Sequence, residues 1–128
     1  MSEVAAELLR FGSGTLVSFD IDGTLELGNP PGPLTRNFVL HVREQGCLIG
    51  SASDRTLREQ EEVWAAFGIE PDFISRKHQL EDVRANFTWS SLFHIGDTHI
   101  DEHFARLAGF AFILVTDLAA VLAGTGRL

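Results

Sequence analysis

The stretch Phe19-Asp20-Ile21-Asp22-Gly23-Thr24 decides how this sequence is interpreted, because it joins a buried strand to a group of polar residues. It follows the apolar, β-rich run Thr15–Phe19, which predicts a strand ending at Asp20. Further along, residues 28–33 combine Gly, Asn and Pro and can only form a loop. The chain therefore leaves a buried strand through two carboxylates and enters an exposed loop.

Outward from this stretch, apolar runs alternate with amphipathic segments about five times. The expected strands cover residues 15–19, 47–52, 72–74, 91–95 and 110–115. The expected helices cover residues 35–45, 57–67, 80–87, 100–108 and 117–123. In the fourth helix, the apolar stripe of Ile100, Phe104, Leu107 and Ala108 marks the expected buried face. Strands this apolar on both faces are typical of a parallel sheet covered by helices on both sides, so the fold class is α/β.

Polar groups follow four of the expected strands, each at the point where the strand ends. They are Asp20, Asp22, Gly23 and Thr24 after the first strand, Ser53, Asp54 and Arg55 after the second, Lys77 after the third, and Asp97 and Asp101 after the fourth. In an open parallel sheet the carboxyl ends of the strands share one edge, and ligands bind there. Carboxylates, a hydroxyl and a cation are the groups needed to hold Mg²⁺ together with a phosphate group.

The segment Phe19–Leu25 (FDIDGTL) resembles the first motif of the haloacid dehalogenase-like (HAD) hydrolases. Three further motifs follow in the family's order: a Ser or Thr after the second strand, a Lys, and then Gly96-Asp97-x-x-x-Asp101. The resemblance covers residues 15–115 or so. It implies a three-layer α/β/α Rossmann-like fold with five parallel strands in the order 5-4-1-2-3. It also implies a Mg²⁺-dependent phosphatase that hydrolyses a phosphomonoester through an aspartyl-phosphate.

The resemblance implies a chemical role for each carboxylate. Asp20 would be the nucleophile and Asp22 the general acid and base. Mg²⁺ would be held by Asp20, Asp97 and the backbone carbonyl of Asp22. Asp101 would lie one helical turn beyond Asp97 and support the site without binding the metal.

The remaining motif residues would contact the phosphate group or substrate. Ser53 would donate a hydrogen bond to a phosphoryl oxygen, and Lys77 would pair with both Asp20 and the phosphoryl group. Gly23 and Thr24 would let the backbone N–H groups after the first strand reach phosphate oxygens. Asp54 and Arg55 would lie beside the substrate.

Three assignments are open at this stage. The hydroxyl after the second strand is Ser53 or Ser51, and we prefer Ser53 because Ser51 is expected to lie inside the strand. Arg55 either contacts the substrate or braces its loop through an acid. His99, in the middle of the fourth motif, is a further candidate for a substrate contact.

The spacing of the motifs leaves no room for the cap domain that most members of this family carry. Residues 23–52 are used up by one loop and one helix, and residues 54–76 by one helix and one short strand. We therefore expect one domain over residues 1–128, with only a small flap at residues 24–33. The substrate would be a phosphorylated small molecule or macromolecule, and an open site fits a large substrate or closure by a second subunit of a homo-oligomer. Magnesium-dependent phosphatases without a cap are the nearest match, and tetrameric sugar-acid phosphatases are the nearest rival.

Composition and charge limit the partners and the cellular compartment that we expect for this chain. With 18 acids, 10 bases and a net charge of −8, the chain is not expected to bind nucleic acid or an anionic membrane. Its longest apolar run, residues 107–115, is about half of a membrane span, and residues 1–11 lack the basic flank of a signal peptide. Cys47 is the one cysteine, so we expect a cytoplasmic protein. The alternative function is a non-catalytic HAD-fold module that binds a phosphorylated ligand or a partner protein.

Overall fold

The described part of the chain, residues 13–125 of this computed structural model, is built on one sheet of five parallel strands. The strands are β1 (Thr15–Phe19), β2 (Leu48–Ser53), β3 (Phe73–Arg76), β4 (Ser91–Gly96) and β5 (Ala111–Leu114). Their order is β3-β2-β1-β4-β5, which is the expected order read from the other edge. The N-terminal stretch from which we argued against a signal peptide lies outside the described residues.

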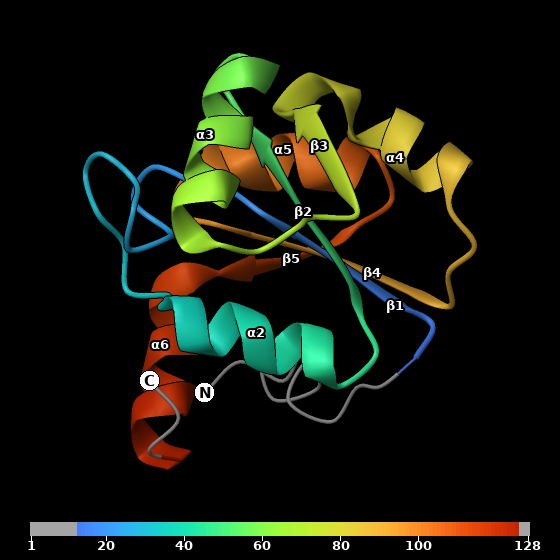
Figure 1. Cartoon of the computed structure of the whole chain (residues 1–128). Coiled ribbons are helices and arrows are strands. Elements are labelled where there is room, and N and C mark those ends of the chain that lie inside the picture. The colour runs from blue at the N-terminus through green and yellow to red at the C-terminus, as the bar shows by residue number, and fades with distance from the viewer. Residues whose placement is uncertain (1–12, 126–128) are drawn as a thin grey trace.

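Helices cover both faces of this sheet, as expected for parallel strands. The helices are α2 (Arg36–Glu44), α3 (Leu57–Phe67), α4 (Leu80–Asn86), α5 (His99–Leu107) and α6 (Val115–Thr125), with a short 3₁₀ helix, η1 (Lys77–Gln79), before α4. Apolar side chains of α2, α3 and α6 form one buried cluster with Val17 of β1, and those of α4 and α5 form a second with Leu16. Neighbouring residues of a strand point to opposite faces, so the sheet lies between two helical layers, with α2 and α6 side by side in one of them (Figure 1).

Local signals set most of the helix boundaries. Thr35, Thr56 and Thr98 are the N-cap residues of α2, α3 and α5, and each side chain accepts a hydrogen bond from a backbone N–H of the first turn. Gly68 ends α3 in the left-handed conformation, with φ of 69°. The last strand is shorter than expected, since Val115 begins α6 instead of ending β5.

The orientation of α5 differs from the expected one. Ile100 and Leu107 of the apolar stripe are 48% and 62% exposed, whereas Asp101 and Ala105 are fully buried. The prediction that the stripe packs on the sheet was therefore wrong for these two residues. The physical reason is that Asp101 forms buried polar contacts at the sheet edge, and those contacts turn its face of the helix inward.

The carboxyl ends of the strands meet at one edge, where the loop between β1 and α2 begins. In Figure 1 this loop extends beyond the end of β1, away from the helices. A single bridge between Leu25 and Leu34 closes it, and both side chains are fully buried. The flap is thus anchored at its base and contains no helix or strand of its own. No helix within residues 13–125 is both long and apolar enough to cross a membrane.

Candidate functional site

A cavity of about 180 Å³ at the carboxyl edge of the sheet brings most of the predicted site residues together. Its lining consists of Asp20, Asp22, Ser53, Asp54, Lys77, Asp97 and Thr98. These residues lie at or just beyond the carboxyl ends of β1, β2, β3 and β4, with Ser53 as the last residue of β2. Six of the seven were predicted from the sequence, and Thr98, the N-cap of α5, was not predicted as part of the lining.

Asp20 is buried at the centre of this group. Its Oδ1 lies 3.5 Å from Nζ of Lys77, and its Oδ2 accepts a hydrogen bond of 3.3 Å from the Thr24 hydroxyl. Burial and the nearby charge of Asp101 raise the pKa of Asp20 to about 8, although Lys77 acts in the opposite direction. The site therefore disfavours the carboxylate form of Asp20 unless more positive charge is present.

Lys77 and Asp101 form a buried ion pair behind Asp20. Nζ of Lys77 lies 3.1 Å from Oδ1 of Asp101, and 3.5 Å from an exposed carboxylate oxygen of Asp54. Burial lowers the pKa of Lys77, but Asp20 and Asp101 outweigh this effect and raise it above its usual range. Burial likewise raises the pKa of Asp101, yet contacts with His94 and Lys77 hold it at about 2. Lys77 is thus a fixed cation beside the expected nucleophile.

Both oxygens of Asp101 are already used by groups of the protein. Oδ1 contacts Lys77 and also Nε2 of His94, at 3.1 Å. Oδ2 accepts hydrogen bonds from the backbone N–H and the hydroxyl of Thr98, at 3.3 and 3.0 Å. Carboxylate oxygens of Asp20, Asp97 and Asp101 all lie within 4.8 Å of one another, a spacing that could hold a metal ion. Because both oxygens of Asp101 already accept two contacts each from the protein, Asp20 and Asp97 are the side chains suited to bind a cation.

Gly23 allows this close approach of Asp97 to β1. Its φ is +75°, and a Cβ at this position would lie 2.0 Å from Oδ2 of Asp97. A side chain here would thus both strain the backbone and collide with a carboxylate of the site. The glycine of the first motif therefore has a steric explanation.

The backbone N–H groups of Gly23 and Thr24 are used by hydrogen bonds to the flap and within the turn. The N–H of Gly23 donates to the carbonyl of Pro30 at 2.7 Å, and the N–H of Thr24 donates to the carbonyl of Ile21 at 3.1 Å. The first bond attaches the flap to the turn. What Thr24 contributes to the site is its hydroxyl, which orients Asp20.

Asp22 is held by an arginine and by the flap. Arg55 donates to both of its oxygens, with the shortest distance, 2.7 Å, between Nη2 and Oδ1. The backbone N–H of Asn29 donates to Oδ1 at 2.8 Å. Partial burial raises the pKa of Asp22, but these bonds outweigh it and lower the pKa below its usual range. Of the two roles left open for Arg55, the structure shows the contact with an acid, and that acid is Asp22 itself.

The choice between the two serines is resolved by their surroundings. Ser53 lines the cavity, and its hydroxyl oxygen accepts a hydrogen bond from the N–H of Arg55. Ser51 lies in the core, where its hydroxyl donates to Gln60 at 2.7 Å and accepts from the Trp64 indole at 2.9 Å. Only Ser53 is therefore placed to contact a ligand in the cavity.

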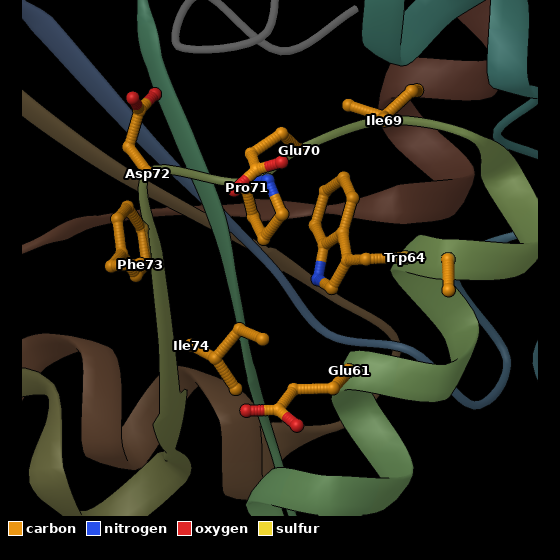
Figure 2. Close-up of a pocket in the computed structure, with 9 residues that line it drawn as sticks. Glu61, Trp64, Ile69, Glu70, Pro71, Asp72, Phe73 and Ile74 are labelled. Atoms are coloured by element: carbon orange, nitrogen blue, oxygen red, sulfur yellow. The ribbon is translucent and has the colours of Figure 1, made fainter.

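His99 lies outside the lining of the small cavity. It lines a neighbouring cavity of about 370 Å³ that also borders Thr98. A wider groove of about 500 Å³ lies between α3 and β3, where Figure 2 shows Trp64, Pro71 and Phe73 beside Glu61 and Asp72. None of the predicted site residues lines this groove.

His94 is a polar residue of the site region whose contacts the sequence did not predict. It is fully buried in β4, where Nδ1 lies 2.9 Å from the Ser18 hydroxyl and Nε2 contacts Asp101. The available signal was a histidine within the otherwise apolar run Ser91–Gly96, opposite a serine in the neighbouring strand.

Compared with protein-family models, with curated proteins and with solved structures, the chain finds no match in any of the three. The likeness to HAD hydrolases therefore stays a resemblance carried by the motifs, and the site geometry has to be interpreted from the chemistry of its residues.

Proposed function

We propose that this chain is a Mg²⁺-dependent phosphatase of the HAD-like type, with a Rossmann-like fold and no cap domain. The observation that carries the proposal is the placement of Asp20 at the carboxyl edge of a parallel sheet. Its buried side chain lies close to the ammonium group of Lys77 and to the carboxylate of Asp97. A carboxylate in such a position is suited to attack phosphorus, because a fixed cation orients it.

Each step uses a residue of the cavity. An oxygen of Asp20 attacks the phosphorus atom, and the bond from phosphorus to the leaving oxygen breaks as Asp22 gives that oxygen a proton. The product of this step is an aspartyl-phosphate. Asp22 then accepts a proton from water, whose oxygen attacks phosphorus and releases Asp20 with inorganic phosphate.

The other cavity residues stabilise charge on the phosphoryl group. Lys77 is close enough to Asp20 to contact a phosphoryl oxygen on the same carboxylate, and the Ser53 hydroxyl is available to donate to another. Charge on the three equatorial oxygens is the main feature of such a transition state, so fixed donors and cations lower the barrier.

The oxygen ligands of the site fit Mg²⁺. Asp20 and Asp97 supply carboxylate oxygens, and the backbone carbonyl of Asp22 is the third proposed ligand. The raised pKa of Asp20 supports this interpretation, because the ionised form of a buried carboxyl close to another acid is stabilised by added positive charge. When bound, Mg²⁺ neutralises the repulsion between a carboxylate nucleophile and an anionic phosphate ester.

An aryl phosphate assay tests the proposal. Purified protein is assayed with Mg²⁺, with EDTA, and as the variants Asp20→Asn and Asp82→Asn, the second being an exposed acid on α4. We expect activity with Mg²⁺ in the wild type and in Asp82→Asn, and loss of at least about 100-fold in Asp20→Asn and with EDTA. Equal rates for wild type and Asp20→Asn would refute the mechanism. Inactivity on a broad phosphomonoester panel would favour the phosphoryl-binding module.

A further inference from the structure

The polar residues His94 and Ser18 lie in the middle of the sheet, on neighbouring strands. The two are direct neighbours in the register of β1 and β4, and both are fully buried. The adjacent residues of β4, Phe93 and Ile95, are apolar and belong to the core. Buried polar side chains lower the stability of a fold unless they form hydrogen bonds. The partners of this buried pair therefore show what the pair contributes.

The contacts of His94 lead from the sheet to the site. Its Nδ1 lies 2.9 Å from the Ser18 hydroxyl, and its Nε2 lies 3.1 Å from Oδ1 of Asp101. A carboxylate can only accept, so Nε2 carries the hydrogen of the contact with Asp101. Nδ1 accepts from the Ser18 hydroxyl in the neutral imidazole and donates to it in the imidazolium. On its other side, in register on β5, the Phe112 ring packs with its centroid 6.4 Å away. The imidazole is thus fixed by both neighbouring strands.

Lys77 is connected to His94 through Asp101. It begins η1 directly after the edge strand β3, and its long side chain has many rotamers. Its Nζ is held by three carboxylates, of which Asp101 is the nearest at 3.1 Å. Thr98 fixes Oδ2 of Asp101, and His94 fixes Oδ1, the oxygen that contacts Lys77.

We propose that His94 is a positioning residue that holds Lys77 against Asp20 by fixing the carboxylate of Asp101. The proposal rests on the proposed function only for its effect on catalysis. Removing the N–H of His94 leaves Oδ1 of Asp101 in contact with Lys77 alone, while Thr98 still holds Oδ2. The carboxylate is then held less firmly on the side that contacts Lys77, so Lys77 is less firmly placed beside the nucleophile, while Asp20 and Asp97, the side chains expected to bind Mg²⁺, keep their positions.

The test uses the fact that Lys77 is the only lysine of the chain. Protein labelled with ¹³C-lysine gives one Cε resonance from a native lysine, and its shift reports the surroundings of Lys77 without any activity. The variants are His94→Leu, which removes the donor, and His94→Gln, whose amide keeps one. Ser51→Ala is the matched control, since it removes buried hydrogen bonds from the same sheet that join neither Asp101 nor the Lys77 side chain.

We expect the Cε resonance to shift or broaden in His94→Leu and to stay near its wild-type position in His94→Gln and in the control. In the aryl phosphate assay, kcat should fall about 10-fold or more in His94→Leu with KM within about 2-fold, and His94→Gln should recover most of it. If His94→Leu does not fold, His94→Asn replaces it, because its shorter amide does not reach Asp101.

The proposal would be overturned if folded His94→Leu, or His94→Asn in its place, gave the wild-type lysine resonance. It would also be overturned if kcat fell equally in His94→Gln and His94→Leu. The two hypotheses fail separately. An inactive wild type refutes the phosphatase, whereas the lysine resonance still decides the role of His94.

Discussion

Replacing the buried carboxylate of Asp20 by an amide should stabilise the metal-free protein. The fold raises the pKa of this group from 3.8 to about 8, mainly by burial. Between these two pH values the unfolded chain releases a proton that the folded protein keeps, so the free energy of unfolding falls as the pH rises. Asp20→Asn removes this dependence, because an amide does not titrate.

The size of the effect follows from the two pKa values. Each pKa unit corresponds to about 1.4 kcal/mol. At pH 7 the ionisation of Asp20 in the unfolded chain therefore lowers the free energy of unfolding by about 4 kcal/mol. The pKa of about 8 already includes the attraction of Lys77 for the Asp20 carboxylate. We therefore expect Asp20→Asn to raise the free energy of unfolding by up to about 4 kcal/mol at pH 7, and the gain to approach zero near pH 4.

Urea unfolding in EDTA at pH 5, 6, 7 and 8 measures this difference. Asp54→Asn is the matched control, because Asp54 also lies 3.5 Å from Lys77 but its side chain is 80% exposed. We expect the control to differ from the wild type by no more than about 0.5 kcal/mol at every pH. The reasoning is refuted if the gain in Asp20→Asn does not grow with pH, or if this variant is less stable than the wild type at pH 8.

Three further substitutions separate the roles of neighbouring residues. Gly23→Ala places a Cβ against the Asp97 carboxylate in a left-handed backbone, so we expect phosphatase activity to fall at least about 100-fold with a weaker thermal shift by Mg²⁺; a wild-type shift and rate would contradict this. Ser53→Ala should lower kcat/KM about 10-fold or more with little effect on stability, whereas Ser51→Ala should leave kcat/KM unchanged and cost about 1 to 3 kcal/mol, because it leaves buried partners such as Trp64 unpaired. Urea unfolding and steady-state rates are measured on both serine variants. Loss of activity in Ser51→Ala and loss of stability alone in Ser53→Ala would contradict the assignment of Ser53 to the phosphate group.

Most of the fold was predictable because its signals are local. The apolar runs and glycine stops predicted the strands within about two residues, and the parallel order followed from both-face burial together with the motif resemblance. The error on α5 had a different origin. Hydrophobic periodicity selects Ile100 and Leu107 as the inner face, but the contacts of Asp101 with Lys77 and His94 lie outside the helix and cannot be seen in its sequence.

The site was predictable to the same degree and for the same reason. Parallel strands bring their carboxyl ends to one edge, so residues that directly follow strands could be placed in one cavity. Contacts made across the sheet could not be placed, since the pairing of Ser18 with His94 depends on strand register. Hydrogen bonds within the turn at Gly23 were also missed, because the flap that accepts one of them folds back by a path the sequence does not reveal.

The contact between Arg55 and Asp22 bears on how the proposed reaction would begin. A general acid has to carry a proton when the leaving oxygen departs, yet Arg55 and the flap hold Asp22 as an anion in this structure. A phosphate ester in the cavity brings negative charge close to Arg55, and its oxygens compete with Asp22 for the guanidinium. Movement of Arg55 toward the substrate would then release Asp22 beside the leaving oxygen. This exchange of partners is a way to couple substrate binding to the protonation of the general acid.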